Sequence, residues 1–374
     1  MGDSSGGYAV AERQLKVEKD TNVKTRLIRV DEQHIDLALI KEAGDVIKAG
    51  GLVAFPTETV YGLGGDALNA QSSEKIYRAK GRPSDNPLIV HIADMETLGV
   101  IVQEIPEGAV KLAERFWPGP LTIILHKSEL VPYETTGGLN TVAVRMPVNP
   151  IARELIRAAG GYVAAPSANR SGRPSPTVAK YVIEDMDGRI EMIIDGGDVK
   201  IGLESTIVDL TTPLPTVLRP GFITRQMLEQ VLGIVEEDST LMRDDSGRAP
   251  KAPGMKYRHY APKGDLTVVD GAEERVVEYI NTQIDRKRKE NKKTGVIATD
   301  TSVVRYHADI CKSVGNRDDE DTIARELYRI LREFDDENVE IIYAESFDTD
   351  GIGQAIMNRL LKAAGHKVVH MQNM

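Results

Sequence analysis

Short apolar runs alternate with amphipathic segments along most of this chain, and this alternation restricts its fold more than any other feature. Runs rich in aliphatic and β-branched residues, bounded by Gly, Pro or Asn, predict strands over 52–56, 88–92, 121–125, 142–146, 162–165, 192–194, 205–210 and 216–218. Apolar residues at spacings of three and four predict helices over 35–48, 72–80, 109–116, 150–159 and 177–185. Strands with helices between them indicate an α/β sheet. This sheet should be mixed, because several connections are too short to hold a helix.

The alternation stops between residues 236 and 264 and then resumes. Strands are predicted over 266–269, 295–298, 339–344 and 367–370, with helices over 273–289, 322–334 and 353–364. This spacing is typical of a smaller, Rossmann-like α/β domain, although it lacks the G-x-G-x-x-G turn that would support a dinucleotide site. The predicted organisation is an N-terminal extension (1–30), a first α/β domain (31–235), an interdomain linker (236–264) and a second α/β domain (265–374).

The charge balance limits the classes of partner. The 374 residues carry 57 acidic and 47 basic side chains, a net charge of −10, which opposes general nucleic-acid binding. An anionic ligand therefore requires a local concentration of positive charge. The single cysteine, Cys311, excludes an internal disulfide and a Cys-cluster metal site. No secretory signal or membrane span of about 18 apolar residues is visible, which predicts a soluble cytoplasmic protein without membrane contact.

The usual catalytic signatures are absent from the sequence. It contains no G-x-S-x-G elbow, no H-E-x-x-H pair and no G-x-x-x-x-G-K-[ST] loop. The seven histidines lack metal-ligand spacing and are best interpreted as ordinary surface or core residues.

Polar and cationic residues instead follow several predicted strands, where open α/β sheets place ligands. PTETVYGLG (56–64) puts hydroxyls, a carboxylate and a glycine turn at a strand end, and KGRPSDNP (80–87) is a proline-stiffened loop with two cations. Arg145 lies in an apolar strand, where an arginine needs an anionic partner or solvent. Each motif alone also fits an ordinary turn, helix end or loop. Together they concentrate positive charge in the first domain through Lys80, Arg82, Arg145, Arg170, Arg173 and Arg219.

Seven blocks in a fixed order resemble the YrdC/Sua5 family: PTETVYGLG, KGRPSDNPLIVHI, FWPGPLTIIL, AVRMP, APSANRSGRPSPT, GLESTIVDL and VLRPG. The trailing PGMKYRHYAP and the second α/β domain are similar to its longer, two-domain Sua5 form, so the resemblance extends from about residue 35 to the C-terminus. It implies a YrdC-like twisted mixed sheet enclosing a positive cavity, followed by a Rossmann-like Sua5 domain. It also implies a nucleotidyltransferase that makes L-threonylcarbamoyl-adenylate and pyrophosphate from L-threonine, bicarbonate or CO2, and ATP. The product would pass to the machinery that makes t6A37 in tRNAs reading ANN codons.

The resemblance also implies roles for individual residues. Lys80 and Arg82 would be the catalytic phosphate clamp. ATP would be bound by Lys80, Arg82, Ser84, Asn86, Thr141, Ser167, Ser175 and Arg219, with Tyr257 or Tyr260 closing over the nucleotide. Threonine would be bound by Thr59, His91, Arg145, Ala165 and Ser205, with Arg145 pairing its carboxylate. Mg²⁺ would be held by the ATP phosphates and by no protein ligand, because no carboxylate cage is visible.

Other interpretations remain open at this point. The chain could be an RNA- or tRNA-binding maturation factor without adenylating activity, although its acidity and scarce aromatics oppose this. It could be an accessory to a carbamoyltransferase, although Cys-rich zinc modules are missing. The linker could fold over the cavity as a lid or act as a strap between the domains, and the second domain could be regulatory or a docking surface.

Overall fold

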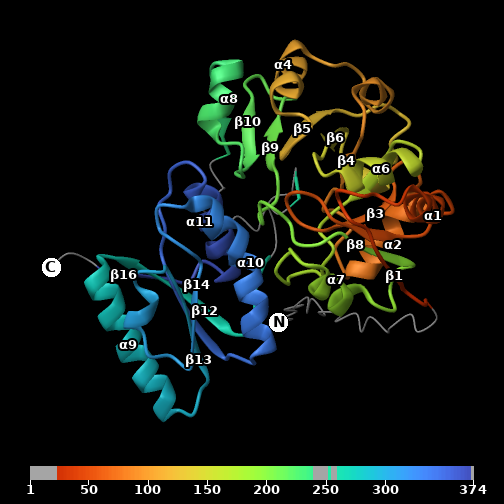
Figure 1. Ribbon diagram of the computed structural model, residues 1–374. Coiled ribbons are helices and arrows are strands. Elements are labelled where there is room, and N and C mark those ends of the chain that lie inside the picture. The colour runs from red at the N-terminus through yellow and green to blue at the C-terminus, as the bar shows by residue number, and fades with distance from the viewer. Residues whose placement is uncertain (1–22, 239–251, 254–258, 372–374) are drawn as a thin grey trace, which may run out of the picture.

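In the computed structural model, which describes residues 23–238, 252–253 and 259–371, the chain forms two sheets covered by helices (Figure 1). The first sheet has the strand order β1-β8-β2-β3-β7-β4-β6-β5-β9-β10-β11 over the described residues. Its strands are β1 (Arg26–Arg29), β2 (Val53–Phe55), β3 (Gly62–Asp66), β4 (Ile89–His91), β5 (Leu121–His126), β6 (Thr141–Arg145), β7 (Val163–Ala165), β8 (Met192–Asp195), β9 (Thr206–Asp209), β10 (Thr216–Arg219) and β11 (Glu236–Glu237). Parallel pairs such as β4 with β6 occur beside antiparallel pairs such as β5 with β6, which confirms the predicted mixed sheet.

The helices of this first unit, which we call the N-terminal domain, cover the sheet. They are α1 (Leu37–Lys48), α2 (Ala70–Lys80), α3 (Leu98–Ile101), α4 (Glu107–Phe116), α5 (Tyr133–Thr136), α6 (Pro150–Ala158), α7 (Ala179–Met186) and α8 (Arg225–Leu232), with a 3₁₀ turn η1 at Met95–Thr97. Helix α1 begins after Asp36, whose side chain accepts hydrogen bonds from two backbone amides. Gly44 lets α1 approach α6, because a Cβ atom at this position would lie 2.6 Å from Ala158.

The second sheet, with its helices, forms the C-terminal domain. Its strand order is β14-β13-β15-β12-β16, and every pair is parallel, as expected for a Rossmann-like domain. The strands are β12 (Asp265–Gly271), β13 (Thr294–Ala298), β14 (Ile310–Ser313), β15 (Ile341–Glu345) and β16 (Val368–Met371). The helices are α9 (Glu273–Lys289), α10 (Glu320–Asp336) and α11 (Gly353–Ala363), with a 3₁₀ turn η2 at Val303–Arg305. Helices α10 and α11 lie on the side toward the N-terminal domain, and α9 lies on the other side (Figure 1).

Some sequence predictions differ from the structure. The predicted glycine turn after 52–56 is wrong, because Gly62–Asp66 is strand β3, paired antiparallel with β2. Its glycines are required by packing, since a Cβ at Gly64 would lie 2.8 Å from Val163 and 2.9 Å from Phe55. The edge strands β1 and β11 extend the sheet four residues into the predicted N-terminal extension and two residues into the predicted linker.

The two domains meet through α10 and the loops that lead into β9 and α7. Gly202, with φ +86°, packs so closely that a Cβ there would lie 2.4 Å from the Cα of Arg325. Arg332 of α10 is completely buried, donating to Asp185 at 2.5 Å and to the Pro174 carbonyl at 3.0 Å. The C-terminal domain therefore contacts the same loops that carry several of the predicted site residues.

Candidate active site

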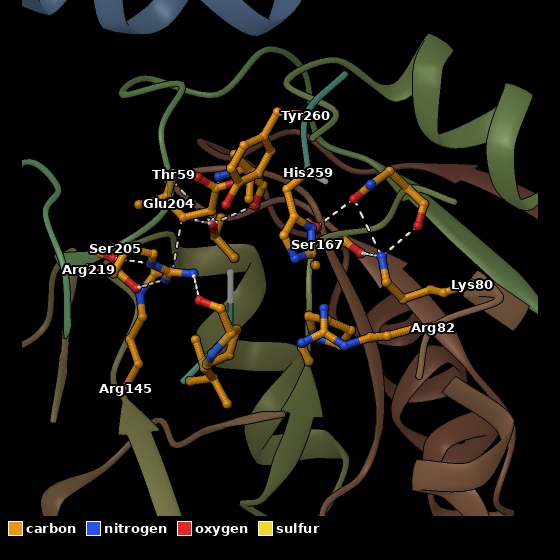
Figure 2. Close-up of a pocket in the computed structure, with 18 of the residues that line it drawn as sticks. Thr59, Lys80, Arg82, Arg145, Ser167, Glu204, Ser205, Arg219, His259 and Tyr260 are labelled. Carbon is orange, nitrogen blue, oxygen red and sulfur yellow. Dashed lines mark hydrogen bonds between the residues drawn. The ribbon is translucent and has the colours of Figure 1, made fainter. Parts of the chain in front are cut away.

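A pocket opens among the strand ends of the N-terminal domain, and Figure 2 shows its side chains converging from several elements. Ten of the predicted residues line it: Thr59, Lys80, Arg82, His91, Arg145, Ala165, Ser167, Ser205, Arg219 and Tyr260. The cavity is only about 60 Å³, far below the roughly 300–1,000 Å³ of a typical small-molecule site. A nucleotide can therefore enter only if part of the wall moves.

Two cations follow each other at the end of α2. Gly81, in the left-handed conformation with φ 64°, ends the helix and separates Lys80 from Arg82. Lys80 Nζ donates to the carbonyls of Ser167 and Asn169, both at 2.5 Å. Burial and the nearby Arg82 lower the pKa of Lys80 well below its usual value. An anionic ligand at this point would favour the ammonium form.

Among the residues that the structure describes, Arg82 donates hydrogen bonds only to its own loop. Its Nε and Nη2 donate to the carbonyls of Asn86 and Pro87 at 3.3 and 3.1 Å. Burial lowers the pKa of Arg82 to about 10, which leaves it charged at neutral pH. Because these partners are carbonyls and not carboxylates, the guanidinium keeps its positive charge for an anionic ligand.

Arg145 enters the pocket from the end of β6. Its Nη2 pairs with Glu58 at 2.5 Å, its Nη1 donates to the Thr59 hydroxyl at 2.9 Å, and its Nε donates to the Gly119 carbonyl at 3.3 Å. Glu58 and Arg145 are 3% and 4% exposed, so the pair is desolvated. The loop between β2 and β3 therefore fixes the direction of this guanidinium.

Arg219 is the last residue of β10 and lines the pocket from that strand. Its Nε donates to the Ser205 carbonyl at 3.0 Å and its Nη2 to the Ser205 hydroxyl at 3.1 Å, which joins the end of β10 to the start of β9. Its Nη1 donates to the carbonyl of Pro253 at 3.2 Å. Burial lowers the pKa of Arg219 to about 10. A residue of the predicted linker is thus attached directly to a pocket arginine.

His91 lies at the end of β4, with its Nδ1 3.1 Å from the carbonyl of Ile89. Burial and the nearby Arg145 lower its pKa to about 3. The imidazole is therefore neutral at physiological pH and adds no charge to the pocket.

This burial predicts an acid-sensitive contribution to stability. Below about pH 6.5 the unfolded chain protonates His91 while the folded chain does not. The free energy of unfolding should therefore decrease as the pH is lowered. Between pH 7 and pH 5 this one group should cost about 2 kcal/mol, which His91→Gln should abolish. Urea unfolding at both pH values measures the difference. The exposed His34→Gln variant is the control, and identical pH dependence in wild type and His91→Gln would contradict the assignment.

Four predicted site residues do not line the pocket. Ser84 is exposed and Thr141 is half-buried on β6, while Ser175 is buried and donates to Glu204 at 2.6 Å. Asn86 is fully buried, and neither atom of its amide finds a hydrogen-bond partner among the described residues. Tyr257 lies outside the described residues.

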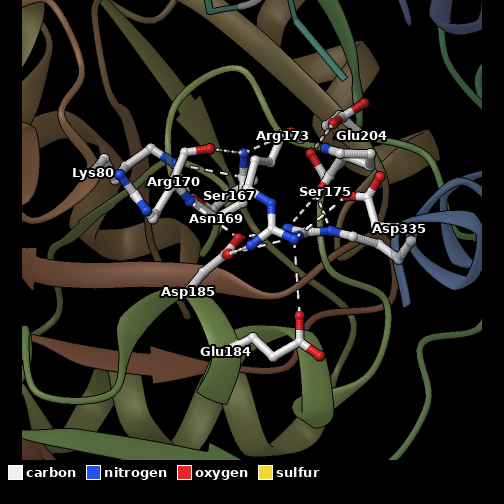
Figure 3. Close-up of polar contacts among 12 residues, drawn as sticks. Lys80, Ser167, Asn169, Arg170, Arg173, Ser175, Glu184, Asp185, Glu204 and Asp335 are labelled. Carbon is white, nitrogen blue, oxygen red and sulfur yellow. Dashed lines mark hydrogen bonds and ion pairs between the residues drawn. The ribbon is translucent and has the colours of Figure 1, made fainter. Parts of the chain in front are cut away.

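Two of the predicted cations also fall elsewhere. Arg170 is exposed, and Arg173 pairs with Asp185 and with Asp335 of the C-terminal domain (Figure 3). Arg173 therefore contributes to the contact between the domains and does not line the pocket.

Asn169, Glu204, Pro253 and His259 also line the pocket, although none of them was among the predicted site residues. Asn169 and Glu204 lie inside motifs that attracted attention for their neighbours. Glu204 was not predicted, because a site for an anion is not expected to contain a carboxylate. His259 and Tyr260 stand side by side with ring centroids 5.6 Å apart, and Tyr260 stacks on Tyr328 of α10 at 5.1 Å.

Within the described ranges, no group of three or more His, Cys, Asp or Glu side chains is arranged to hold a metal ion. In the same ranges, no helix combines the length and apolar character needed to cross a membrane. The fold and pocket together define a two-domain α/β protein with a cationic site at the strand ends of its larger sheet.

The comparisons with known proteins agree with this description. Residues 45–221 match a family model described as "Telomere recombination" (Sua5_yciO_yrdC), and residues 223–365 match "Threonylcarbamoyl-AMP synthase, C-terminal domain". The chain belongs to the Sua5/YrdC family, in its two-domain Sua5 form. A Pyrococcus abyssi relative named threonylcarbamoyl-AMP synthase is 49% identical, covering 92% of this chain and 99% of the relative. A relative of the same name from Bacillus subtilis is 47% identical over 91% and 96%. The crystal structure of P. abyssi Sua5 complexed with L-threonine superimposes with a TM-score of 0.88, at 48% identity, covering 93% of this chain and all of that one.

Proposed function

We propose that this protein is a threonylcarbamoyl-AMP synthase, which forms threonylcarbamoyl-AMP and pyrophosphate from L-threonine, bicarbonate or CO2, and ATP. The observation that carries the proposal is the 47–49% identity, over more than nine-tenths of the chain, to two relatives that bear this name. The threonine complex of P. abyssi Sua5 supports L-threonine as a substrate. The product then serves t6A37 formation in tRNAs reading ANN codons, and it is handed to the threonylcarbamoyl transfer machinery in the cytoplasm.

The chemistry requires charge compensation more than a protein nucleophile. The unprotonated amine of threonine adds to CO2 with loss of a proton, or to bicarbonate with loss of water. The resulting N-carboxylate attacks the α-phosphorus of ATP as pyrophosphate leaves. Attacking group, phosphates and leaving group are all anionic, so cations that reduce their repulsion and hold an in-line geometry accelerate the step. Lys80 and Arg82 are assigned to the phosphates, together with Arg219.

The threonine end of the pocket is assigned to the Arg145 side. The Arg145 guanidinium is directed by Glu58 and Thr59, and the neutral His91 lies beside it on β4. A carboxylate that approaches this guanidinium would gain a charge-assisted hydrogen bond. Ala165 leaves space for the substrate, and Ser205 lies between the two ends, bonded to Arg219 and Thr122.

Mg²⁺ is assigned to the ATP phosphates. It prefers oxygen ligands and retains several waters when it binds nucleotides. The lining side chains fit this role, because cations and hydroxyls dominate and Glu204, the one lining carboxylate among the described residues, is already bonded elsewhere.

ATP entry requires displacement of the residues of the 236–264 segment that close the pocket, Pro253, His259 and Tyr260. These three residues would then act as a lid over the pocket. Movement of the adjacent loop, residues 82–86, would also give the unpartnered Asn86 amide a ligand to bind. With Ser84 on the same loop, the two residues would then join the nucleotide site.

The test is mass spectrometry of the product formed from ATP, threonine and bicarbonate, together with pyrophosphate release. Threonine-dependent release of pyrophosphate and a product with the mass of threonylcarbamoyl-AMP are expected. Filter binding with tRNA, run in parallel, tests an RNA-binding maturation factor without adenylating activity. Binding of tRNA with no pyrophosphate release would overturn the proposed function.

A further inference from the structure

Glu204 is a carboxylate in a pocket proposed to bind a triphosphate. Among the lining residues that the structure describes it carries the only negative charge, and it is 7% exposed. An ionised carboxylate in this position would repel phosphate oxygens, and burial strengthens that repulsion because little water screens it. The pocket can bind an anion only if the charge of Glu204 is compensated.

The compensation comes from the C-terminal domain. Arg359 of α11 is completely buried, and its Nε donates to Glu204 Oε2 at 3.1 Å. Tyr328 of α10 donates to the same oxygen at 3.0 Å, while Ser175 donates to Oε1 at 2.6 Å. Both oxygens of Glu204 are therefore held by donors. Arg359 also donates to the Pro220 carbonyl at 2.6 Å, next to Arg219 in sequence.

Arg219 is the pocket residue that depends on this arrangement. With Glu204 bonded to Arg359, Arg219 is held by neutral partners, the Ser205 carbonyl and hydroxyl and the Pro253 carbonyl. Arg359 and Arg219 both favour the charged form of Glu204, so that its pKa is lowered although burial alone would raise it. If Arg359 were absent, Arg219, Lys362 and Lys80 would remain as the charged neighbours of this buried carboxylate, and Arg219 would be drawn toward it.

We infer that Arg359 is a positioning residue for the nucleotide site: it neutralises Glu204 across the domain boundary and so leaves the charge of Arg219 for the phosphates of ATP. The inference rests on the proposed function, because it assigns the pocket a triphosphate. It gives the C-terminal domain a part in substrate binding, although neither α10 nor α11 contributes a residue to the pocket lining among the described residues.

Other pairs join the domains without touching a lining carboxylate, so the effect of Arg359 can be separated from general contact between the domains. Arg332 pairs with Asp185, Arg173 with Asp335 (Figure 3), and the exposed Lys180 with Asp336 at 2.6 Å. Asp185, Asp335 and Asp336 do not line the pocket. Loss of the Lys180 pair removes a contact between the domains but adds no charge to the site.

The test compares full-length Arg359→Met, the double variant Arg359→Met/Glu204→Gln and the control Lys180→Met. ATP and threonine affinities are measured by calorimetry, with KM and kcat from pyrophosphate release. Arg359→Met should weaken ATP binding by roughly 30-fold or more, because one partner of a buried pair is lost. Threonine affinity should change by less than about threefold, which is the size of effect expected from a substitution away from the threonine site. The double variant should recover most of the ATP affinity, because the uncompensated charge is gone. Lys180→Met should match the wild type.

Three results would overturn the inference. They are unchanged ATP affinity in Arg359→Met, equal losses for ATP and threonine, or no recovery in the double variant although its circular dichroism and melting show a folded protein. If Arg359→Met does not fold, the double variant is compared with Glu204→Gln alone. Equal ATP affinity in these two variants is expected, and a much weaker ATP affinity in the double variant would contradict the inference. Failure of the wild type to bind ATP would instead refute the proposed function.

Discussion

Replacement of Arg82 by alanine is expected to reduce synthesis of threonylcarbamoyl-AMP by roughly a thousandfold, the scale seen when a charge-stabilising arginine is removed from phosphoryl transfer. The fold should persist, because in the described part of the chain Arg82 donates only to the Asn86 and Pro87 carbonyls of its own loop. Threonine-dependent pyrophosphate release from ATP measures the effect. Arg78→Ala is the matched control, because Arg78 is an exposed arginine in the last turn of α2, the helix that ends just before Arg82.

A normal rate in a folded Arg82→Ala protein would show that Arg82 is not part of the phosphate clamp. Lys80→Ala should also lose activity, but it is a less specific test. Its ammonium binds the Ser167 and Asn169 carbonyls, so its removal also leaves the 167–169 loop without these bonds.

Replacement of Arg145 by alanine is expected to weaken threonine binding at least a hundredfold, because the substrate carboxylate loses its cationic partner. ATP binding should change much less. The variant also leaves Glu58, which is 3% exposed, without its ion pair, and this should lower the free energy of unfolding by about 3–5 kcal/mol. Calorimetric titration with threonine and urea unfolding measure the two effects separately.

Arg145→Ala/Glu58→Gln removes the unpaired carboxylate and should recover stability but not threonine affinity. This separates the binding role of Arg145 from its structural role. Arg157→Ala, which breaks a surface pair with Asp94, should leave both measurements unchanged. Unaltered threonine affinity in the double variant would contradict the assignment of Arg145 to the carboxylate.

Much of the fold was predictable because its strands and helices have clear periodicity. The helix predicted over 273–289 is α9 with the same bounds, and the strand predicted over 121–125 is β5 with one further residue. Strand β3 was not predictable from propensity, because three of its five residues are glycines that permit close packing. The edge strands β1, β11 and β14 are short or polar and carry little signal.

Most of the predicted site residues line one pocket, and the motifs that contain them made this set predictable. The roles assigned to them stay predictions. What the sequence cannot supply is the set of partners that direct each charge. Arg145 and Glu58 are 87 residues apart, and only the strand order β2-β3-β7-β4-β6 brings them together. Ser175 likewise binds Glu204, a residue 29 positions away, and lies behind the pocket wall.

The C-terminal domain was the least predictable contributor. Arginines on α10 and α11 have the spacing of ordinary charged helix faces, and nothing in the sequence distinguishes Arg332 and Arg359 from exposed neighbours such as Arg325. Both are completely buried because their partners, Asp185 and Glu204, belong to the other domain. Such contacts depend on how the two domains meet.

These two guanidinium groups also determine how the molecule can come apart. When the domains separate, each guanidinium must also give up its hydrogen bond to a carbonyl of the other domain, Pro174 for Arg332 and Pro220 for Arg359. Partial opening at this boundary is therefore costly, since it leaves ions neither hydrated nor paired. We expect heat to melt both halves in one cooperative transition, so that an isolated N-terminal fragment would lose part of the stability that the intact chain provides.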